Sequence, residues 1–193
     1  MPDTLFIVVV EGEPDRAATV LDALAGDSVS LRVIEPGPGL ARRIAALQPD
    51  LVLIDAANPS RDELEELTLA SGPLERPVAI FVDRSDSQMT RAVIEAGVAA
   101  YVVDGLTPAR LRPVLDAAVA RFGMLHRMRT ELAQTRAALE ERKLIDRAKG
   151  ILMRARNLPE DEAYALMRKT AMEKNRRIAE IAQAIVTASE MLK

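Results

Sequence analysis

Short uninterrupted apolar runs alternate with amphipathic segments over residues 1–120, and this alternation constrains the fold more than any other feature of the chain. The runs are rich in β-branched residues, as is typical of strands that are buried on both faces. Strands that alternate with helices predict a parallel sheet with helices on both sides, and the right-handed crossover rule leaves few ways to arrange it. The five expected strands are Leu5–Val10, Leu31–Ile34, Leu51–Ile54, Val78–Val82 and Ala100–Val103.

Residues that favour helix starts stand between these runs. Pro14 opens the first expected helix, and Pro108 opens the last. Ser60 is expected to cap the third helix, with Asp62 and Glu63 in its first turn, where acidic side chains suit the positive helix end. The expected ranges of the second, third and fourth helices are Leu40–Leu47, Ser60–Leu69 and Gln88–Ala96.

From Glu141 onward, apolar residues recur at three- and four-residue spacing in three successive segments, which predicts three helices. Asn157 and Leu158 end the first pattern, and Pro159 stands at a first helical position, followed by three acidic residues. A basic corner over residues 174–177 precedes the third pattern. The apolar positions are Leu144, Ile145, Ala148, Ile151, Leu152 and Ala155, then Ala163, Leu166, Met167, Thr170 and Ala171, then Ile178, Ile181, Ala182, Ile185, Val186 and Leu192.

A helical segment without a strong break links the two patterns, and its apolar residues follow the alternating three- and four-residue steps of a coiled-coil seam. The seam covers only about two heptads, so packing against the first domain is an alternative to dimerisation. We favour dimerisation, because the leucines would otherwise be exposed. His126, the only histidine, is expected to be a solvated linker residue. The seam residues are Leu125, Met128, Leu132, Thr135 and Leu139.

The charge is divided unequally along the chain. Residues 1–120 hold 10 Arg and no Lys against 19 acidic residues, a net charge of −9, whereas residues 121–193 hold 16 basic and 10 acidic residues, a net charge of +6. A basic half beside an acidic half suggests that the basic half meets a polyanion, although an ordinary solvated helical surface is the alternative. We therefore expect a sheet domain over residues 1–120, a coiled-coil helix over 121–140 and a helical domain over 141–193.

The three-helix segment resembles the ANTAR domain, an RNA-binding module of transcription antiterminators. The resemblance depends on residues that span the whole segment: Ala148, Lys149, Gly150, Ile151, Leu152 and Met153, then Ala163, Leu166, Met167 and Arg168, then Ala171, Met172, Ala182, Gln183, Ala184 and Ile185. It implies binding to paired hairpin loops in a leader mRNA, which prevents a terminator stem from forming. Glycine inside a helix costs about 1 kcal/mol relative to alanine, so we expect Gly150 to allow close helix approach, a merely tolerated glycine being the alternative.

Basic side chains of this segment are the candidate RNA contacts, and phosphate contacts would make the affinity fall with salt. Tyr164 is the only aromatic residue of the three helices, and it could stack on an extruded base or belong to the core. A DNA-binding helix-turn-helix is the main rival, but its recognition helix would be the mostly apolar segment 178–192. The candidate contacts are Lys149, Arg154, Arg156, Tyr164, Arg168, Lys169, Lys174, Arg176 and Arg177.

The first domain resembles the receiver domain of response regulators, a flavodoxin-like fold whose site lies at the carboxyl ends of the strands. Asp55 stands at the phosphoacceptor position, but Glu11 supplies only one of two expected carboxylates. Val82 replaces the expected hydroxyl residue, and Asp104 replaces the expected lysine. Glu11 and Asp55 could still supply two magnesium ligands, yet Asp104 works against a phosphoryl group. We therefore interpret the domain as a degenerate receiver that docks another protein, and expect no cofactor.

Within the ANTAR group the chain is most similar to NasT-type regulators of nitrate and nitrite assimilation, which implies control by a nitrate-sensing partner protein. The supporting residues are Pro59–Asp62 and Ala100–Leu106. A phosphorylation-switched regulator and a pure protein adaptor are the alternatives. We expect no enzyme, because there is no cysteine, no Gly-Lys-Ser/Thr nucleotide loop and no residue set for a catalytic triad. The start lacks a signal peptide and Leu5–Val10 is too short to span a bilayer, so we expect a cytoplasmic chain without a membrane segment.

Overall fold

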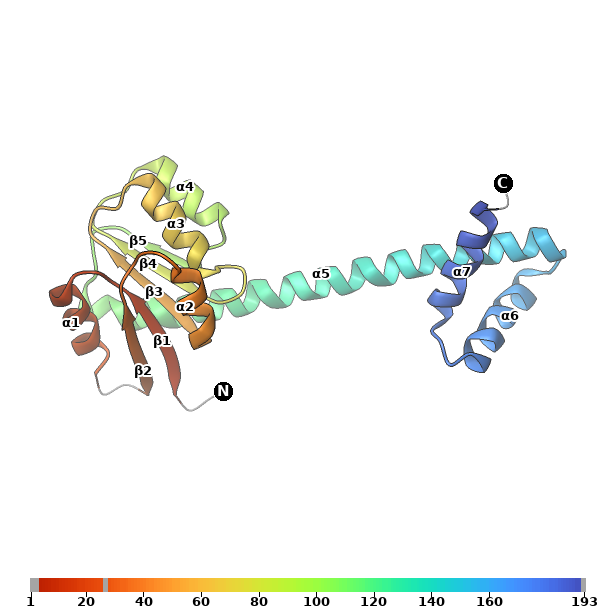
Figure 1. The fold of residues 1–193 in the computed structure, drawn as a ribbon, viewed down its shortest axis with the longest axis horizontal. Coiled ribbons are helices and arrows are strands. Elements are labelled where there is room, and N and C mark those ends of the chain that lie inside the picture. Colours follow the sequence, from red (N-terminus) through yellow and green to blue (C-terminus); the bar gives the residue numbers. More distant parts are fainter. Residues whose placement is uncertain (1–3, 26–27, 192–193) are drawn as a thin grey trace. The chain divides into compact units, whose positions relative to one another are not determined.

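The amino-terminal part of the chain forms a parallel sheet with strand order β2-β1-β3-β4-β5, as a flavodoxin-like receiver fold requires (Figure 1). The computed structural model describes residues 4–25 and 28–191. Register is regular across the sheet, with Val8 opposite both Arg32 and Val52. The predicted sheet is confirmed, with small shifts at strand ends. The strands are β1 (Leu5–Val10), β2 (Val29–Ile34), β3 (Leu51–Ala56), β4 (Val78–Val82) and β5 (Ala100–Val102).

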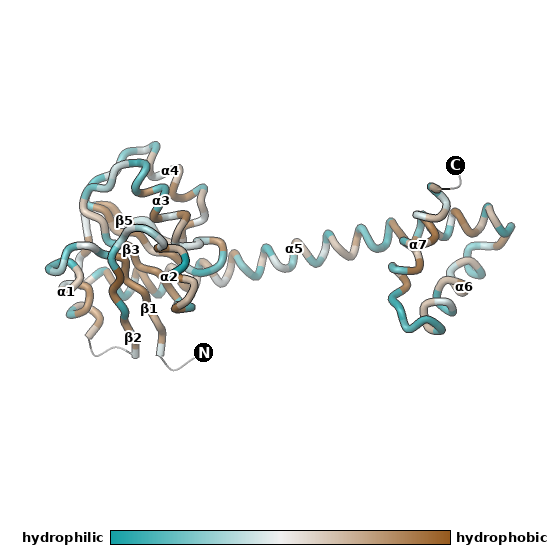
Figure 2. The backbone as a smooth tube through the Cα atoms, in the orientation of Figure 1, coloured by the Kyte–Doolittle hydropathy of each residue, from teal (hydrophilic) through white to brown (hydrophobic). Residues whose placement is uncertain are grey.

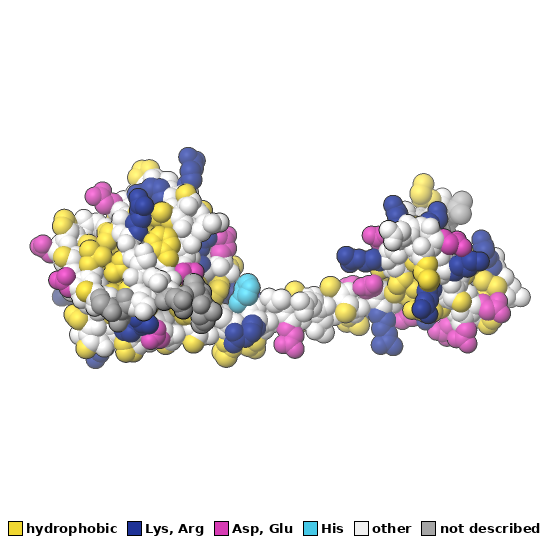
Figure 3. All heavy atoms as spheres, turned by 90° about the horizontal axis from the view of Figure 1, so that it is seen from below, with side chains coloured by type: hydrophobic (Ala, Val, Ile, Leu, Met, Phe, Trp, Pro, Cys, Tyr) yellow, Lys and Arg dark blue, Asp and Glu magenta, His cyan; other side chains and the backbone are white. Residues whose placement is uncertain are grey.

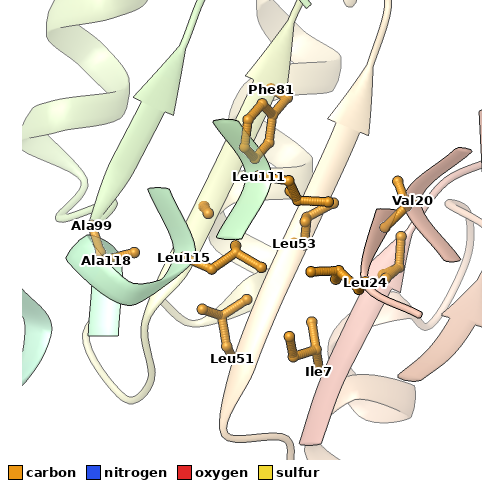
Figure 4. Close-up of a cluster of buried hydrophobic side chains, with 12 residues drawn as sticks. Ile7, Val20, Leu24, Leu51, Leu53, Phe81, Ala99, Leu111, Leu115 and Ala118 are labelled. Carbon is orange, nitrogen blue, oxygen red and sulfur yellow. The ribbon is translucent and has the colours of Figure 1, made fainter. Parts of the chain in front are cut away.

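Two hydrophobic clusters fill the space between the sheet and the helices on its faces. On one face, α1 (Pro14–Ala23) and the first turns of α5 (Pro108–Arg156) contribute Val20 and Leu111 (Figure 4). The opposite face is covered by three helices, and all of β4 is buried under these layers. These helices are α2 (Leu40–Leu47), α3 (Arg61–Ser71) and α4 (Ser87–Glu95). Figure 2 shows the resulting hydrophobic strands enclosed by more hydrophilic helices.

Helix starts follow the predicted capping chemistry. Ser60 is the N-cap of α3, and its hydroxyl accepts the Glu63 backbone N–H while the Glu63 carboxylate accepts that of Ser60. This reciprocal capping box lowers the pKa of Glu63, because the backbone hydrogen bond stabilises its ionised form. Helix α4 begins before the predicted Gln88, because the Asp86 carboxylate accepts the N–H groups of Gln88 and Met89, both at 2.8 Å.

Helix α5 continues from the sheet unit into the helical unit. The first helix expected from Glu141 is therefore the end of α5 and not a separate element. Compact packing divides the chain after His126, beyond the predicted boundary at residue 120, because Phe122 still packs on the sheet cluster. The His126 ring stacks on Phe122 at a centroid distance of 5.7 Å. The predicted linker histidine is thus exposed, with its ring against a neighbouring aromatic residue.

The helical unit packs the end of α5 against α6 (Glu160–Glu173) and α7 (Ile178–Met191). Its centre is made by Ala148, Ala182 and Met167, which are almost completely buried. Pro159 is the N-cap of α6, whereas the sequence placed it at the first helical position, so the helix begins one residue later than predicted. Its backbone is extended, with φ −65° and ψ 162°. Leu192, which belongs to the predicted third stripe, lies outside the described residues. Across residues 4–25 and 28–191, no helix is both long and apolar enough to cross a bilayer.

Gly150 does not provide the close helix approach that was predicted for it. A Cβ built at this position meets only the Arg154 guanidinium, at an ordinary contact distance of 3.6 Å. We expect Gly150→Ala to raise the free energy of unfolding of the helical unit by about 0.5–1 kcal/mol, because alanine has less backbone entropy to lose in a helix. Chemical denaturation followed by far-ultraviolet circular dichroism measures this change.

Ala148, two residues earlier on the same helix, is the matched control. Its side chain is fully buried in the contact with α6 and α7. Ala148→Leu should lower the free energy of unfolding by about 1–3 kcal/mol, because extra methylenes do not fit a packed core. A destabilising Gly150→Ala substitution would contradict the conclusion that this glycine is merely tolerated.

Candidate functional site

The carboxyl edge of the sheet gathers the predicted receiver-site residues. Glu11, which follows β1, is 6% exposed, and Asp55, near the end of β3, is 4% exposed. Val82 is buried at the end of β4 and offers no hydroxyl group. Asp104 is exposed and has a left-handed backbone, with φ 75°. The structure therefore brings Glu11 and Asp55 together.

Arg16 of α1 occupies the centre of this edge. Its Nε donates to Asp55 Oδ2 at 3.1 Å and its Nη2 donates to Asp55 Oδ1, so both oxygens of the acceptor-like carboxylate accept from one guanidinium. The Nε also lies 3.4 Å from Glu11 Oε2. Such a two-pronged pair matches the planar fork of arginine. Sequence reasoning missed Arg16, although Pro14 fixes the start of α1 directly after β1 and so points its first turn toward this edge.

Asp83 is the second residue that sequence reasoning missed. It follows Val82 directly, and its carboxylate oxygen Oδ2 lies 3.3 Å from Arg16 Nη1. Its backbone N–H donates to the Ala57 carbonyl, which fixes the loop after β4. Gly105 passes close to it, since a Cβ there would lie 2.9 Å from Asp83 Oδ1 and the backbone has φ +76°. Only glycine fits this approach without strain.

The ionisation of the cluster follows from burial and pairing. Burial raises the pKa of Asp55, the nearby Glu11 charge acts in the same direction, and the hydrogen bonds from Arg16 oppose both. Burial acts to lower the pKa of Arg16, but the hydrogen bonds that Arg16 donates to Asp55 and Asp83 act more strongly together, so the pKa is raised above its ordinary value. Arg16 donates to both oxygens of Asp55, and two accepting oxygens are the pattern of an ionised carboxylate. Asp55 is therefore paired with a permanent cation.

The predicted magnesium site does not fit this arrangement. A guanidinium stands against both expected ligands, Glu11 and Asp55, where a divalent cation would need free oxygen lone pairs. Within residues 4–25 and 28–191, no group of three or more acidic, histidine or cysteine side chains is arranged to hold a metal ion. The possible magnesium ligation by Glu11 and Asp55 is therefore corrected to an internal ion-paired cluster.

The predicted RNA contacts lie on the helical unit, and the structure separates them by availability. Arg147, which is not one of the predicted contacts, reaches from α5 to Glu190 of α7 at 2.6 Å and so links two helices of this unit. Lys169 lies 3.9 Å from Glu173 and Arg176 lies 4.0 Å from Glu180, in each case four residues later in the chain. Both ion pairs are long and exposed. In the described part of the chain, no ion pair involves the exposed cations Arg154, Arg156, Arg168, Lys174 and Arg177. Figure 3 shows basic side chains spread over the visible face of this unit.

Lys149 is a clamp between α5 and α6. Its ammonium lies 2.8 Å from Asp146 and 2.6 Å from Glu160, and its side chain is only 16% exposed. The hydrogen bonds that the ammonium donates to Asp146 and Glu160 raise the pKa of Lys149. The two carboxylates neutralise the charge of this ammonium and occupy its N–H donors, so fewer donors remain for a phosphate than on a free lysine. Lys149 is therefore the least available of the predicted cations, and its contact with RNA remains a prediction.

One exposed face of α6 combines an aromatic ring with free charge. Tyr164, Arg168 and Met172 recur at four-residue spacing, and they border one shallow depression with Lys169 and Ala165. Tyr164 is 42% exposed and Met172 74% exposed, so neither side chain is needed for the core. The structure therefore favours the surface interpretation of Tyr164 over a core tyrosine. We call Tyr164, Arg168, Lys169 and Met172 the α6 face.

The basic corner after α6 is built by a left-handed residue. Asn175 has φ 49°, and the N–H of Arg176 donates back to the Ala171 carbonyl at 2.9 Å. This pattern is a Schellman-type helix end, in which asparagine can replace the usual glycine. It turns Lys174 and Arg177 outward as exposed cations. The last turn of α5 presents Arg154 and Arg156, which also suit the negative end of that helix.

The predicted seam of α5 is exposed in the single chain. Residues 126–143 contain no buried or half-buried side chain. Met128 is 59% exposed, Leu132 50% and Leu139 51%, whereas Leu125 is half-buried. These three side chains form one exposed apolar stripe on α5.

Part of the carboxyl-terminal region matches a family model. Residues 133–186 match the family model of the ANTAR domain. The transcriptional regulatory protein PdtaR of Mycobacterium tuberculosis is 27% identical over 139 residues, which cover 72% of this chain and 68% of that protein. The nitrate regulatory protein of Klebsiella oxytoca is 43% identical over 67 residues, 35% of this chain and 17% of that protein.

Solved receiver domains share the fold of the amino-terminal unit. The receiver domain of a LuxO repressor homologue from Vibrio parahaemolyticus covers 63% of this chain and 94% of its own, with 16% identity and a TM-score of 0.52. The receiver domain of RstA from Klebsiella pneumoniae covers 59% of this chain and 97% of its own, with 24% identity and a TM-score of 0.50. At these identities the likeness shows the fold alone.

Proposed function

We propose that this chain, an ANTAR-domain homologue of response regulators, is a transcription antiterminator that binds paired hairpins in a leader mRNA and prevents a terminator stem from forming. The α6 face within the matched segment carries this proposal, because it offers a stacking ring beside two exposed cations, Arg168 and Lys169. Nitrate or nitrite assimilation genes are the proposed targets, and a nitrate-sensing partner protein is the proposed control. The resemblance to the Klebsiella oxytoca nitrate regulatory protein supports this target.

The chemistry of the α6 face suits single-stranded loops of folded RNA. Bases in hairpin loops can leave the stack and rest on an aromatic ring, which contributes about 1–3 kcal/mol per base. Tyr164 offers such a ring at 42% exposure, and Arg168 lies one helical turn away. Arg168 and Lys169 can then hold the phosphates on either side of the stacked base. This arrangement recognises a loop through one base and its backbone.

The exposed face of α7 argues against the rival DNA-binding function. Its buried side carries Ile181, Ala182 and Val186, which leaves Glu180 and Glu190 among its exposed residues. A recognition helix needs donors for base edges and no acidic side chains facing phosphates. Among the exposed residues of α7, Gln183 and Thr187 could contact base edges, but they hydrogen-bond to each other at 3.2 Å and no basic side chain of this helix accompanies them. The third helix therefore suits the major groove poorly.

A homodimer is proposed as the active form. The exposed stripe of Met128, Leu132 and Leu139 recurs at coiled-coil spacing, so a second copy of α5 is the partner that matches it residue for residue. Two ANTAR domains held by one coiled coil would suit two adjacent hairpins. Linking two binding events raises the overall affinity without any new contact, because the second event becomes intramolecular.

A binding titration tests the proposal. The full chain is titrated against a leader RNA with two hairpins, a linear RNA of the same composition and duplex DNA, at several salt concentrations. We expect tight binding to the hairpin RNA with an affinity that falls steeply as salt rises, and weak binding to the other two. Equal binding to duplex DNA and hairpin RNA, or hairpin binding that salt does not change, would contradict the proposal.

A further inference from the structure

We propose that the guanidinium of Arg16 is a built-in cation that replaces the divalent metal ion of a receiver domain, and that it keeps the amino-terminal unit from binding Mg²⁺ and from accepting a phosphoryl group on Asp55. This inference concerns the sheet unit alone and does not depend on the RNA-binding proposal. It follows from the disagreement between the receiver fold, which implies a metal site, and the residues found at the carboxyl edge of the sheet.

One guanidinium reaches three carboxylates that come from three different strand ends. Its Nε faces Asp55 Oδ2 at 3.1 Å and Glu11 Oε2 at 3.4 Å, so these two oxygens border the same point. Its Nη1 faces Asp83 Oδ2 at 3.3 Å on the outer side. The Asp55 and Glu11 side chains are 2% and 5% exposed, whereas that of Asp83 is 38% exposed. A cation at this position is therefore enclosed by oxygens on its inner side.

The cluster needs a cation for its charge. Glu11 Oε2 is buried, and within the described residues it has no hydrogen-bond partner, while Glu11 Oε1 accepts the N–H groups of Gly12 and Glu13. Without Arg16, three carboxylates would face one another in a partly buried space, and like charges at such distances repel strongly. Oxygen ligands of this kind are those that Mg²⁺ and Ca²⁺ prefer. As they stand, the described carboxylates are not arranged to hold a metal ion. Removing the guanidinium should therefore let Glu11, Asp55 and Asp83 close around a divalent cation in its place.

The same contacts make Asp55 a poor phosphoryl acceptor. Both of its carboxylate oxygens accept hydrogen bonds from Arg16, which withdraws charge from each oxygen and places the guanidinium where a metal-bound phosphoryl donor would have to approach. Arginine keeps its proton at every physiological pH, and as a covalent part of the chain it cannot be removed by chelation or dilution. Unlike a metal ion, this cation is present in every copy of the protein at all times.

Metal titration of the full chain tests the inference. Mn²⁺ is titrated into the wild-type chain, Arg16→Gln and Arg16→Gln/Asp83→Asn, with calorimetry for binding and circular dichroism for thermal unfolding. We expect no binding by the wild-type chain at millimolar Mn²⁺, and an affinity about tenfold or more higher for Arg16→Gln, because one repelling charge is gone. Mn²⁺ should raise the unfolding temperature of Arg16→Gln only, since a ligand that binds the folded state stabilises it.

Further variants decide between the inference and a purely structural role for Arg16. Arg16→Lys keeps the charge and should not bind Mn²⁺, whereas Arg16→Gln/Asp83→Asn should lose most of the gained affinity. If Arg16→Gln is partly unfolded, added Mn²⁺ should restore its far-ultraviolet circular dichroism signal. Acetyl phosphate with Mg²⁺ should not label Asp55 in the wild-type chain. The inference is overturned by wild-type binding as tight as that of Arg16→Gln, by an Arg16→Gln chain that neither binds nor refolds with Mn²⁺, or by labelled wild-type Asp55.

Discussion

Replacing Leu132 and Leu139 by aspartate is expected to convert the chain from a dimer to a monomer at micromolar concentration. Each leucine is about half exposed in the single chain and would be buried in a coiled coil. Burying a leucine side chain contributes about 1.5–3 kcal/mol, and the symmetric dimer would lose this at four positions and face buried charge in addition. Sedimentation velocity measures the change directly.

Ala137→Asp is the matched control for the seam. Ala137 is exposed on the same helix but lies off the stripe, so the added charge should leave the dimer intact. The double variant should also bind a two-hairpin RNA more weakly while its affinity for a single hairpin stays unchanged, because only the linked second event is lost. A wild-type chain that sediments as a monomer with and without RNA would contradict the dimer.

Arg168→Glu is expected to lower the affinity for hairpin RNA by about 10- to 100-fold at moderate salt. Arg168 is exposed next to Tyr164, and within the described residues no ion pair neutralises it. A hydrogen bond to a charged group contributes about 1.5–3 kcal/mol, and the reversed charge would repel the same phosphate. Arg168→Ala should reduce the slope of log affinity against log salt by about one. Fluorescence anisotropy across a salt series gives both quantities.

Two controls separate a local contact from a general effect of charge. Arg136→Glu makes the same charge change on the exposed stalk and should change the affinity far less. Lys149→Ala should reduce the salt slope less than Arg168→Ala does, because the ammonium of Lys149 is already held by Asp146 and Glu160. If Arg136→Glu weakened binding as much as Arg168→Glu, the α6 face would be no more than part of a diffuse positive field.

Local patterns of the sequence predicted the elements of this fold well. The buried strands could be read from continuous apolar runs, and the cap at Ser60 from its Glu63 partner three residues later. The exposed stripe around Leu132 followed from spacing alone. These features depend on neighbours within a few residues along the chain, where the sequence pattern and the physical cause coincide. Element ends shifted by a residue or more where a cap such as Asp86 was not considered.

Contacts between distant segments were not predictable in the same way. The Arg16 cluster joins residues 39 and 67 positions apart, so only the fold brings the guanidinium to Asp55 and Asp83. Counting charges likewise could not distinguish Lys149, which clamps two helices, from Arg168, which has no ion pair among the described residues. The expectation for Gly150 was wrong for the same reason, because the space around a Cβ depends on how neighbouring helices pack.

Single-round transcription through a leader that ends in an intrinsic terminator tests the central claim most directly. Purified full chain is added to a template that encodes two hairpins ahead of the terminator, and the readthrough fraction is measured. We expect readthrough to rise with protein concentration, to lose this response when the hairpin loop bases are changed, and to respond weakly to the Arg168→Glu protein. Readthrough that does not change with the wild-type protein, although the hairpins fold and the protein is intact, would contradict the account.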